Sequence, residues 1–276
     1  MPNYQDWIGK TEEIPDQLSA SPAQRMAATL NQPTAFVEGA SLPPAWHWLY
    51  FLPAVRLNNT GEDGHTRRGD FLPPVTLPRR MWAGGRIVFH QPLHIGERAL
   101  KKSRVAEVTS KQGKSGELVF VKVVHEIVGE NGLSLLEEQD IVFREPPSGA
   151  APPSAEIQVL QHQWSQTITP TPVLLFRYSA LTFNSHRIHY DVDYCRNVEG
   201  YPGLVVHGPL TATLLLESLR AQEPDRTVKT FSFRAVNPLY ADQPVRLEGR
   251  IDGDDVQLWA LNPEGSLAMQ ASATLE

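Results

Sequence analysis

Apolar and polar residues alternate along several stretches of each half of the chain, a pattern typical of half-buried β-strands. In the first half the alternation predicts strands at 86–91, 99–110, 117–128 and 133–144. In the second half it predicts strands at 227–236, 245–251, 255–261 and 266–274. Turn sequences such as Asn131-Gly132 and Asp252-Gly253 separate neighbouring strands. We therefore expect antiparallel hairpins in both halves.

One segment, from Gly208 to Leu219, has the pattern of a buried helix. Pro209 suits the first turn of a helix, because the N–H that proline lacks would have no partner there. Apolar residues occupy nearly every face of the segment, so other elements should enclose it. A second apolar run, at 173–182, is expected to be a strand that opens the second half. The first half offers only a weak helix candidate, because the prolines at 43–44, 73–74 and 78 interrupt it.

The two halves resemble copies of one unit. Residues 91–96 (Gln-Pro-Leu-His-Ile-Gly) and 237–242 (Asn-Pro-Leu-Tyr-Ala-Asp) occupy the same place in the two series of strands. Between the halves, the segment 145–158 is rich in prolines, which favour an extended linker. We expect an N-terminal domain at 1–144, a linker at 145–158 and a C-terminal domain at 159–276. Each domain should be an α+β unit in which a curved antiparallel sheet wraps a helix.

Composition narrows the class of protein. The chain has 276 residues, a formal net charge of −6 and 41% hydrophobic residues, so it can build a large core and lacks the basic character of a nucleic-acid binder. The single cysteine, Cys195, excludes an internal disulfide and a cysteine-based zinc site. No apolar run is long enough to span a bilayer, and no signal peptide is evident at the start. We expect a cytoplasmic protein with no membrane partner.

The densest cluster of reactive side chains lies just before the predicted buried helix, at 183–191. It contains His186 and His189 three residues apart, with Asn184 and two aspartates, Asp191 and Asp193, close by. Histidine is the side chain best suited to move protons near neutral pH. The alternative is a surface loop whose histidines only make structural hydrogen bonds.

In this chain the histidine segment is followed by the pair His207-Gly208 at the start of a buried helix. This order resembles that of the MaoC-like, hydratase-2 enzymes. That family carries the signature Asp-x-Asn-Pro-(aliphatic)-His, followed by a His-Gly pair that begins the central helix. Its final His falls on His189, its Asp position on Asn184 and its Pro position on Arg187. Residues 178–191 are most similar to the branch with mitochondrial-type 3-hydroxyacyl-thioester dehydratases and mesaconyl- or itaconyl-CoA hydratases. Residues 61–65, 69–74 and 78–85 resemble the N-terminal half of that branch.

The resemblance implies an α+β double hot-dog fold with a catalytically degenerate first domain. It also implies a hydro-lyase that adds water to the double bond of a short branched dicarboxylic enoyl-CoA, itaconyl-CoA or mesaconyl-CoA, to give citramalyl-CoA. His189 would be the acid/base. Asn184 cannot be a base, so it would orient the water, unless it is simply a turn residue. His189 would then be the principal acid/base, unless Asp191, Asp193 or a first-half residue such as Asp70 supplies a carboxylate.

Further roles follow from the same resemblance. The N–H of Gly208, at a helix N-terminus, would bind the thioester oxyanion, although relief of crowding beside the sheet is an equally good reason for glycine there. Arg187 would bind the second carboxylate of the substrate, with Arg79 and Arg80 as further candidates. His207 is expected to be structural or to line the pocket. No metal and no cofactor are expected, because coenzyme A is part of the substrate.

Two other functions remain open. One is a (3R)-hydroxyacyl-thioester dehydratase of fatty acid synthesis, with a hydrophobic tunnel in place of a cationic end. The other is a non-catalytic double hot-dog subunit, because Asn184 replaces the expected carboxylate. The aromatic run at 46–51 is either the floor of an acyl pocket or plain core. The expected partners are the acyl-CoA substrate and a second copy of the chain in a homodimer.

Overall fold

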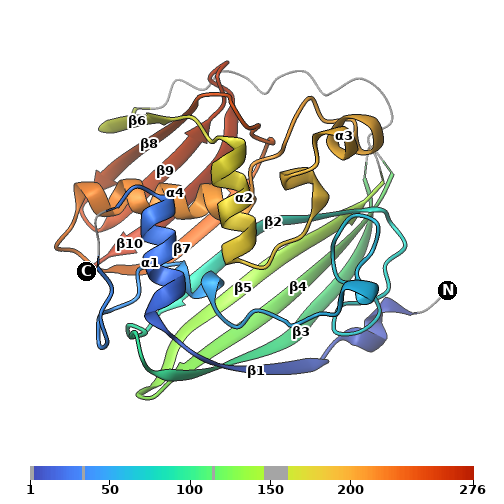
Figure 1. The fold of residues 1–276 in the computed structure, drawn as a ribbon, viewed down its shortest axis with the longest axis horizontal. Helices are drawn as coiled ribbons and strands as arrows, with labels where there is room; N and C mark the ends of the chain where they lie inside the picture. Colours follow the sequence, from blue (N-terminus) through green and yellow to red (C-terminus); the bar gives the residue numbers. More distant parts are fainter. Residues whose placement is uncertain (1–2, 33–34, 114–115, 146–160) are drawn as a thin grey trace.

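The computed structural model describes residues 3–32, 35–113, 116–145 and 161–276. In these residues ten strands form one antiparallel sheet in the order β1-β3-β4-β5-β2-β7-β10-β9-β8-β6 (Figure 1). The first-half strands are β1 (Thr11–Gln17), β2 (Arg79–Phe89), β3 (Arg98–Gly113), β4 (Gly116–Gly129) and β5 (Gly132–Arg144). The second-half strands are β6 (Trp164–Ile168), β7 (Val228–Ala235), β8 (Val245–Asp252), β9 (Asp255–Leu261) and β10 (Leu267–Leu275).

The strand order contains an internal repeat. Read from the two edges inward, β1-β3-β4-β5-β2 matches β6-β8-β9-β10-β7, so each half builds the same five-stranded unit. The two units join where β2 pairs with β7, with Gly84 opposite Arg234 and Gly85 opposite Phe233. A β-carbon on Gly84 would lie 2.5 Å from the carbonyl oxygen of Phe233, so the close approach of these two strands requires glycine. The predicted double hot-dog fold is confirmed, with the two sheets merged into one.

Four helices accompany the sheet: α1 (Ala20–Thr29), α2 (Pro172–Leu181), α3 (Val192–Tyr194) and α4 (Gly208–Gln222). The prediction of a buried helix from Gly208 is confirmed, since α4 lies across the second-half strands and buries eight side chains (Figure 1). Its Glu217 accepts hydrogen bonds from Trp46 Nε1 (2.9 Å) and from Gln32 Nε2 (2.7 Å). Both donors belong to the first half, so the central helix of the second half also forms hydrogen bonds that hold the two halves together.

The strand expected at 173–182 is wrong, because this run forms α2. Thr171 caps the helix by accepting a hydrogen bond from the N–H of Leu174, and Pro172 occupies its first turn. Leu175 and Tyr178 are buried while Phe176 is exposed, a helical spacing that the uniformly apolar sequence hides. The first strand of the second half is instead β6, a short edge strand.

The first half holds its helix before the prolines. α1 follows β1 directly and packs against α2 at the junction of the two units (Figure 1). The eight predicted strands are all present, as β2–β5 and β7–β10. Of the linker predicted at 145–158, all but Glu145 lies outside the described residues. The part of the chain that the structure describes contains no helix with the length and hydropathy needed to cross a membrane.

Candidate active site

Four histidines from three separate segments form a continuous series of ring contacts, which we call the histidine column. The rings of His65 and His186 lie 3.9 Å apart between centroids, those of His186 and His189 lie 5.4 Å apart, and those of His189 and His207 stack at 3.6 Å. The sequence analysis had grouped His186 with His189 and had noted His207 at the start of the central helix. His65 comes from a first-half loop more than a hundred residues away.

His189 lies in a 3-10 turn (Arg187–His189) between α2 and α3, and only 7% of its surface is exposed. Its Nδ1 lies 2.7 Å from the carbonyl oxygen of Val205. A carbonyl oxygen only accepts, so Nδ1 carries the hydrogen and Nε2 keeps a lone pair. Burial lowers the pKa of His189 to about 4, although the hydrogen bond to Val205 raises it. The imidazole is therefore neutral at pH 7 and able to accept a proton at Nε2.

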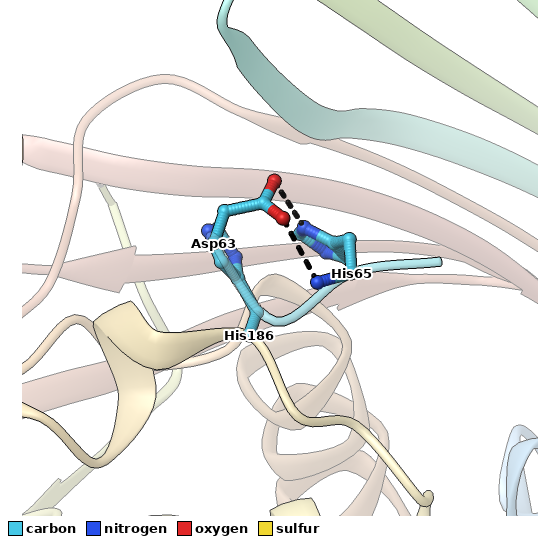
Figure 2. Close-up of side chains that lie close together, drawn as sticks. All are labelled: Asp63, His65 and His186. Atoms are coloured by element: carbon cyan, nitrogen blue, oxygen red, sulfur yellow. Dashed lines mark hydrogen bonds and ion pairs between the residues drawn. The ribbon is translucent and has the colours of Figure 1, made fainter. Parts of the chain in front are cut away.

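Asp63 and His65 form the first-half end of the column (Figure 2). One carboxylate oxygen of Asp63 lies 3.2 Å from Nδ1 of His65, and the other accepts from the backbone N–H of His65 at 3.0 Å. Burial raises the pKa of Asp63, but the hydrogen bonds and charge of His65 outweigh it and hold that pKa well below its usual range. Burial lowers the pKa of His65 to about 4. At neutral pH the pair is a carboxylate and a neutral imidazole.

The sequence analysis missed this pair, although residues 61–65 had been noted as part of the family resemblance. Instead it offered Asp191, Asp193 and Asp70 as carboxylates for His189. Asp191 caps α3 by accepting from the N–H of Tyr194, and it also binds Arg187, so its oxygens are occupied. The carboxylate that does reach the histidine column is Asp63.

Asn184 is partly buried at the entrance of the 184–189 loop. Its side-chain oxygen accepts a hydrogen bond of 3.0 Å from the backbone N–H of His186, which is an Asx turn. The carboxamide thus shapes the loop that carries the two central histidines. Among the described residues its amide nitrogen has no hydrogen-bond partner, and this nitrogen is the atom it can still offer to a water.

The three candidate arginines differ in what already binds them. Arg187 donates to Asp191 Oδ2 at 2.7 and 3.0 Å, and Arg79 forms an ion pair with Glu199. Arg80 makes no side-chain hydrogen bond or ion pair within the described ranges. Burial lowers the pKa of Arg80 to about 10 while Asp63 raises it, so Arg80 stays charged beside the column. Arg80 is therefore the one of the three with a guanidinium left for a ligand.

Gly208 is the first residue of α4, where a backbone N–H has no acceptor inside the helix. A β-carbon on Gly208 would have the carbonyl oxygen of Trp82 as its nearest neighbour, at 3.8 Å, an ordinary contact. The protein itself thus does not require glycine for space there. His207, just before it, has Nε2 2.8 Å from Ser179 Oγ, and its buried Nδ1 has no partner among the described residues.

The aromatic run at 46–51 is largely core. Trp46 is buried and bonded to Glu217. Trp48 packs edge-on against Trp82 and Phe233, with ring centroids 5.1 and 6.0 Å away.

A hollow of about 400 Å³ opens beside Asp63. It is lined by residues of the first-half loop, by Pro78 just before β2, and by Tyr194 of α3. The hollow thus reaches Asp63, the residue bonded to the first histidine of the column.

Asp63, His65 and His186 also have the composition of a metal site. Each offers one ligand atom, and the three atoms lie within 4.8 Å of one another. A carboxylate and two neutral imidazoles suit zinc. The charge of Arg80 opposes a cation here, since it acts on both His65 and His186. These three side chains therefore have donor atoms that suit a metal ion, but the positive charge of Arg80 beside them does not favour one.

Comparison with known proteins identifies the relatives of this chain. Residues 45–241 match the hydroxyacyl-thioester dehydratase type 2 family. The mesaconyl-C(4)-CoA hydratase of Chloroflexus aurantiacus is 46% identical over 275 residues, which cover 99% of this chain and 98% of the relative. The mitochondrial hydroxyacyl-thioester dehydratase type 2 of Schizosaccharomyces pombe is 31% identical, over 85% of this chain and 88% of the relative.

Solved structures with little sequence similarity share the fold. A MaoC-like dehydratase from Phytophthora capsici superposes with a TM-score of 0.71 at 15% identity, covering 100% of this chain and 99% of the other. A Mycobacterium tuberculosis protein with a double hotdog fold superposes with a TM-score of 0.63 at 13% identity, covering 100% and 98%.

Proposed function

Because the chain belongs to the hydroxyacyl-thioester dehydratase type 2 family, we propose that it is a hydro-lyase that adds water reversibly to the double bond of an acyl-CoA thioester. Both relatives described above carry the names of hydratases or dehydratases of thioesters. The single observation that carries the proposal is His189, a buried neutral imidazole with a fixed tautomer, whose ring stacks on that of His207, the residue that precedes Gly208 at the start of a buried helix.

In the hydration direction, Nε2 of His189 takes a proton from water as the oxygen attacks the β-carbon. The electron pair of the double bond moves toward the thioester carbonyl, whose oxygen becomes negative. The N–H of Gly208 at the N-terminus of α4 stabilises that oxygen, because the helix dipole is positive there. The proton held by His189 then passes to the α-carbon. No cofactor takes part, because coenzyme A belongs to the substrate.

The substrate that we favour is a short branched dicarboxylic enoyl-CoA, mesaconyl-C4-CoA, whose hydration by these steps gives citramalyl-CoA. The name of the 46%-identical relative supports this choice. Itaconyl-CoA is the alternative substrate, and it gives citramalyl-CoA if His189 delivers the proton to the methylene carbon of its double bond in place of the α-carbon. In mesaconyl-C4-CoA the free carboxylate is attached to the β-carbon, the atom that water attacks. Its cation must therefore lie close to the proton-transfer group. Arg80 is charged, makes no hydrogen bond or ion pair among the described residues and acts electrostatically on His65 and His186, so we assign the carboxylate to Arg80.

The second candidate is the dehydration of longer (3R)-hydroxyacyl thioesters, which the 31%-identical relative's name favours. Hydration rates, followed as loss of enoyl-thioester absorbance, distinguish the two on a panel of mesaconyl-C4-CoA, itaconyl-CoA, crotonyl-CoA and a C8 enoyl-CoA. We expect the highest kcat/KM with a dicarboxylic thioester. Better turnover of the C8 thioester would favour the fatty-acyl dehydratase, and no turnover at all would favour a non-catalytic subunit. Size-exclusion chromatography of the same sample tests the predicted homodimer.

A further inference from the structure

We propose that the first half of the chain supplies a second catalytic residue, His65, which holds the attacking water, and that Asp63 positions it. The proposal rests on the hydration reaction proposed above. It replaces the expectation of a catalytically degenerate first half, and it concerns two residues to which the sequence analysis gave no role.

The contacts of Asp63 fix the tautomer of His65. Nδ1 of His65 lies 3.2 Å from a carboxylate oxygen that is ionised at neutral pH and can only accept, so Nδ1 carries the hydrogen. The second carboxylate oxygen binds the backbone N–H of the same histidine, which prevents the carboxylate from turning away. Nε2 of His65 keeps its lone pair and has no hydrogen-bond partner in the part of the chain that the structure describes. His189 has the same tautomer for the same reason, since Val205 accepts from its Nδ1.

The loop that carries Asp63 and His65 is bonded to the loop that carries His189. The backbone N–H of Arg187 donates to the carbonyl of Asp63 at 2.9 Å. The hydroxyl of Ser185 donates to the carbonyl of Gly64 at 2.6 Å. These bonds place the ring of His65 against His186, which in turn contacts His189. Because these bonds join backbone atoms of the first-half loop to the second-half loop, His65 has a defined position relative to His189.

This arrangement supplies what position 184 lacks. The family pattern has a carboxylate there, whereas Asn184 uses its oxygen to shape its own loop. In our scheme Nε2 of His189 accepts one hydrogen of the water and Nε2 of His65 accepts a hydrogen bond from the other. The water oxygen bonds to the β-carbon, the first hydrogen ends on the α-carbon by way of His189, and the second stays on the product hydroxyl. His65 ends the cycle unchanged.

The test compares isosteric variants of neighbouring residues. In Asp63→Asn the carboxamide no longer demands a hydrogen on Nδ1, and in His65→Gln the imidazole is absent. We expect kcat for mesaconyl-C4-CoA to fall ten- to a hundredfold in both, with KM within about threefold of wild type. Glu62→Gln makes the same acid-to-amide change one residue away on an exposed side chain, and should retain wild-type kcat.

Nitrogen NMR of histidine-labelled protein provides a readout independent of turnover. It should show His65 with its hydrogen on Nδ1 in the wild type and a changed tautomer in Asp63→Asn. Folding is checked by thermal unfolding, and the isosteric Asp63→Asn serves if His65→Gln fails to fold. Wild-type kcat in Asp63→Asn, or in a folded His65→Gln, would overturn the proposal. So would a chelator that inactivates the wild type to the level of the variants, because the three side chains would then be metal ligands.

Failure of this proposal is distinguishable from failure of the proposed function. If the wild type hydrates a thioester and His189→Ala does not, while Asp63→Asn and His65→Gln remain fully active, only the role of the first half is refuted. If the wild type hydrates none of the panel, the hydration reaction itself is refuted, and this proposal with it.

Discussion

Gly64 and Ser185 touch across the junction of the two halves: a β-carbon on Gly64 would overlap the carbonyl oxygen of Ser185, and Gly64 has φ +86°. Any other residue there would be strained and would push the two loops apart. The contact brings a first-half loop with an Asp–His pair against the second-half loop with the predicted catalytic histidine. The site is thus shared between two halves that repeat the same strand order.

His189→Ala should lower the hydration kcat by at least about a hundredfold, the usual contribution of a general acid/base. Nε2 of His189 has no hydrogen-bond partner among the described residues, so its loss removes the proton acceptor. The change also removes the hydrogen bond to Val205 and two ring contacts, so thermal unfolding of the variant is measured beside its kinetics. His162→Ala is the control, since that side chain is 41% exposed. A folded His189→Ala protein with near-normal turnover would contradict the assignment.

Asn184→Ala should cost activity, but less than His189→Ala, because it breaks the Asx turn that shapes the histidine loop and leaves the base in place. Asn184→Asp keeps the oxygen that accepts from His186, so we expect it to retain more activity than Asn184→Ala. Steady-state kinetics of the two variants side by side measure the difference. Full activity of Asn184→Ala would make Asn184 a turn residue alone, and an inactive Asn184→Asp would show that the amide hydrogens are needed.

How far the sequence predicts this molecule depends on the range of the interactions involved. The long strands follow from alternation, because one face of each is buried. Alternation does not predict β1, because it is an edge strand with no buried residue. It also contains Pro15 and three acidic residues, Glu12, Glu13 and Asp16. α2 was mistaken for a strand although Thr171-Pro172 is a helix-start signal. Local patterns thus give elements correctly where burial is one-sided and fail at edges and in uniformly apolar runs.

The residues of the candidate site also divide into those that the sequence predicts and those that it does not. His189, Asn184 and Gly208 lie within 25 residues of one another in a motif, so a resemblance finds them together. Asp63 and His65 reach the site through pairing of loops that are distant in sequence, and nothing in residues 61–65 indicates what they face. The identity of the free arginine is equally non-local, since it depends on Glu199 binding Arg79 and Asp191 binding Arg187.

Arg80→Met should lower kcat/KM for mesaconyl-C4-CoA by about tenfold to a hundredfold and leave crotonyl-CoA within about threefold. A charge-assisted bidentate contact with a carboxylate is worth roughly 1.5–3 kcal/mol, and crotonyl-CoA has no carboxylate to lose. Arg67→Met is the control, since Arg67 is an exposed arginine that lines the hollow beside Asp63. Equal losses with both thioesters would mean that Arg80 supports the fold or binds coenzyme A, and does not select the acyl group.

The histidine column should make the protein less stable as the pH falls below about 6.5. Burial lowers the pKa of His65 and His189 to about 4, that of His186 further, and that of His207 well below its ordinary value, whereas the unfolded chain protonates near 6.5. Between those values the unfolded chain binds protons that the folded protein does not, so the free energy of unfolding decreases as the pH falls through this window. Above it these histidines have no effect.

Each such histidine should contribute a slope of up to about 1.4 kcal/mol per pH unit inside the window. Urea denaturation at pH 7, 6 and 5 measures how the free energy of unfolding changes with pH. We expect the slope to be smaller in His186→Gln than in the wild type, because the variant takes up about one proton fewer on unfolding. Phe183→Leu changes an exposed, non-titrating side chain of the same loop and should keep the wild-type slope. An unchanged slope in His186→Gln would mean that His186 takes up its proton in the folded protein as readily as in the unfolded chain, and the column would not be the neutral array on which the proposed proton transfer depends.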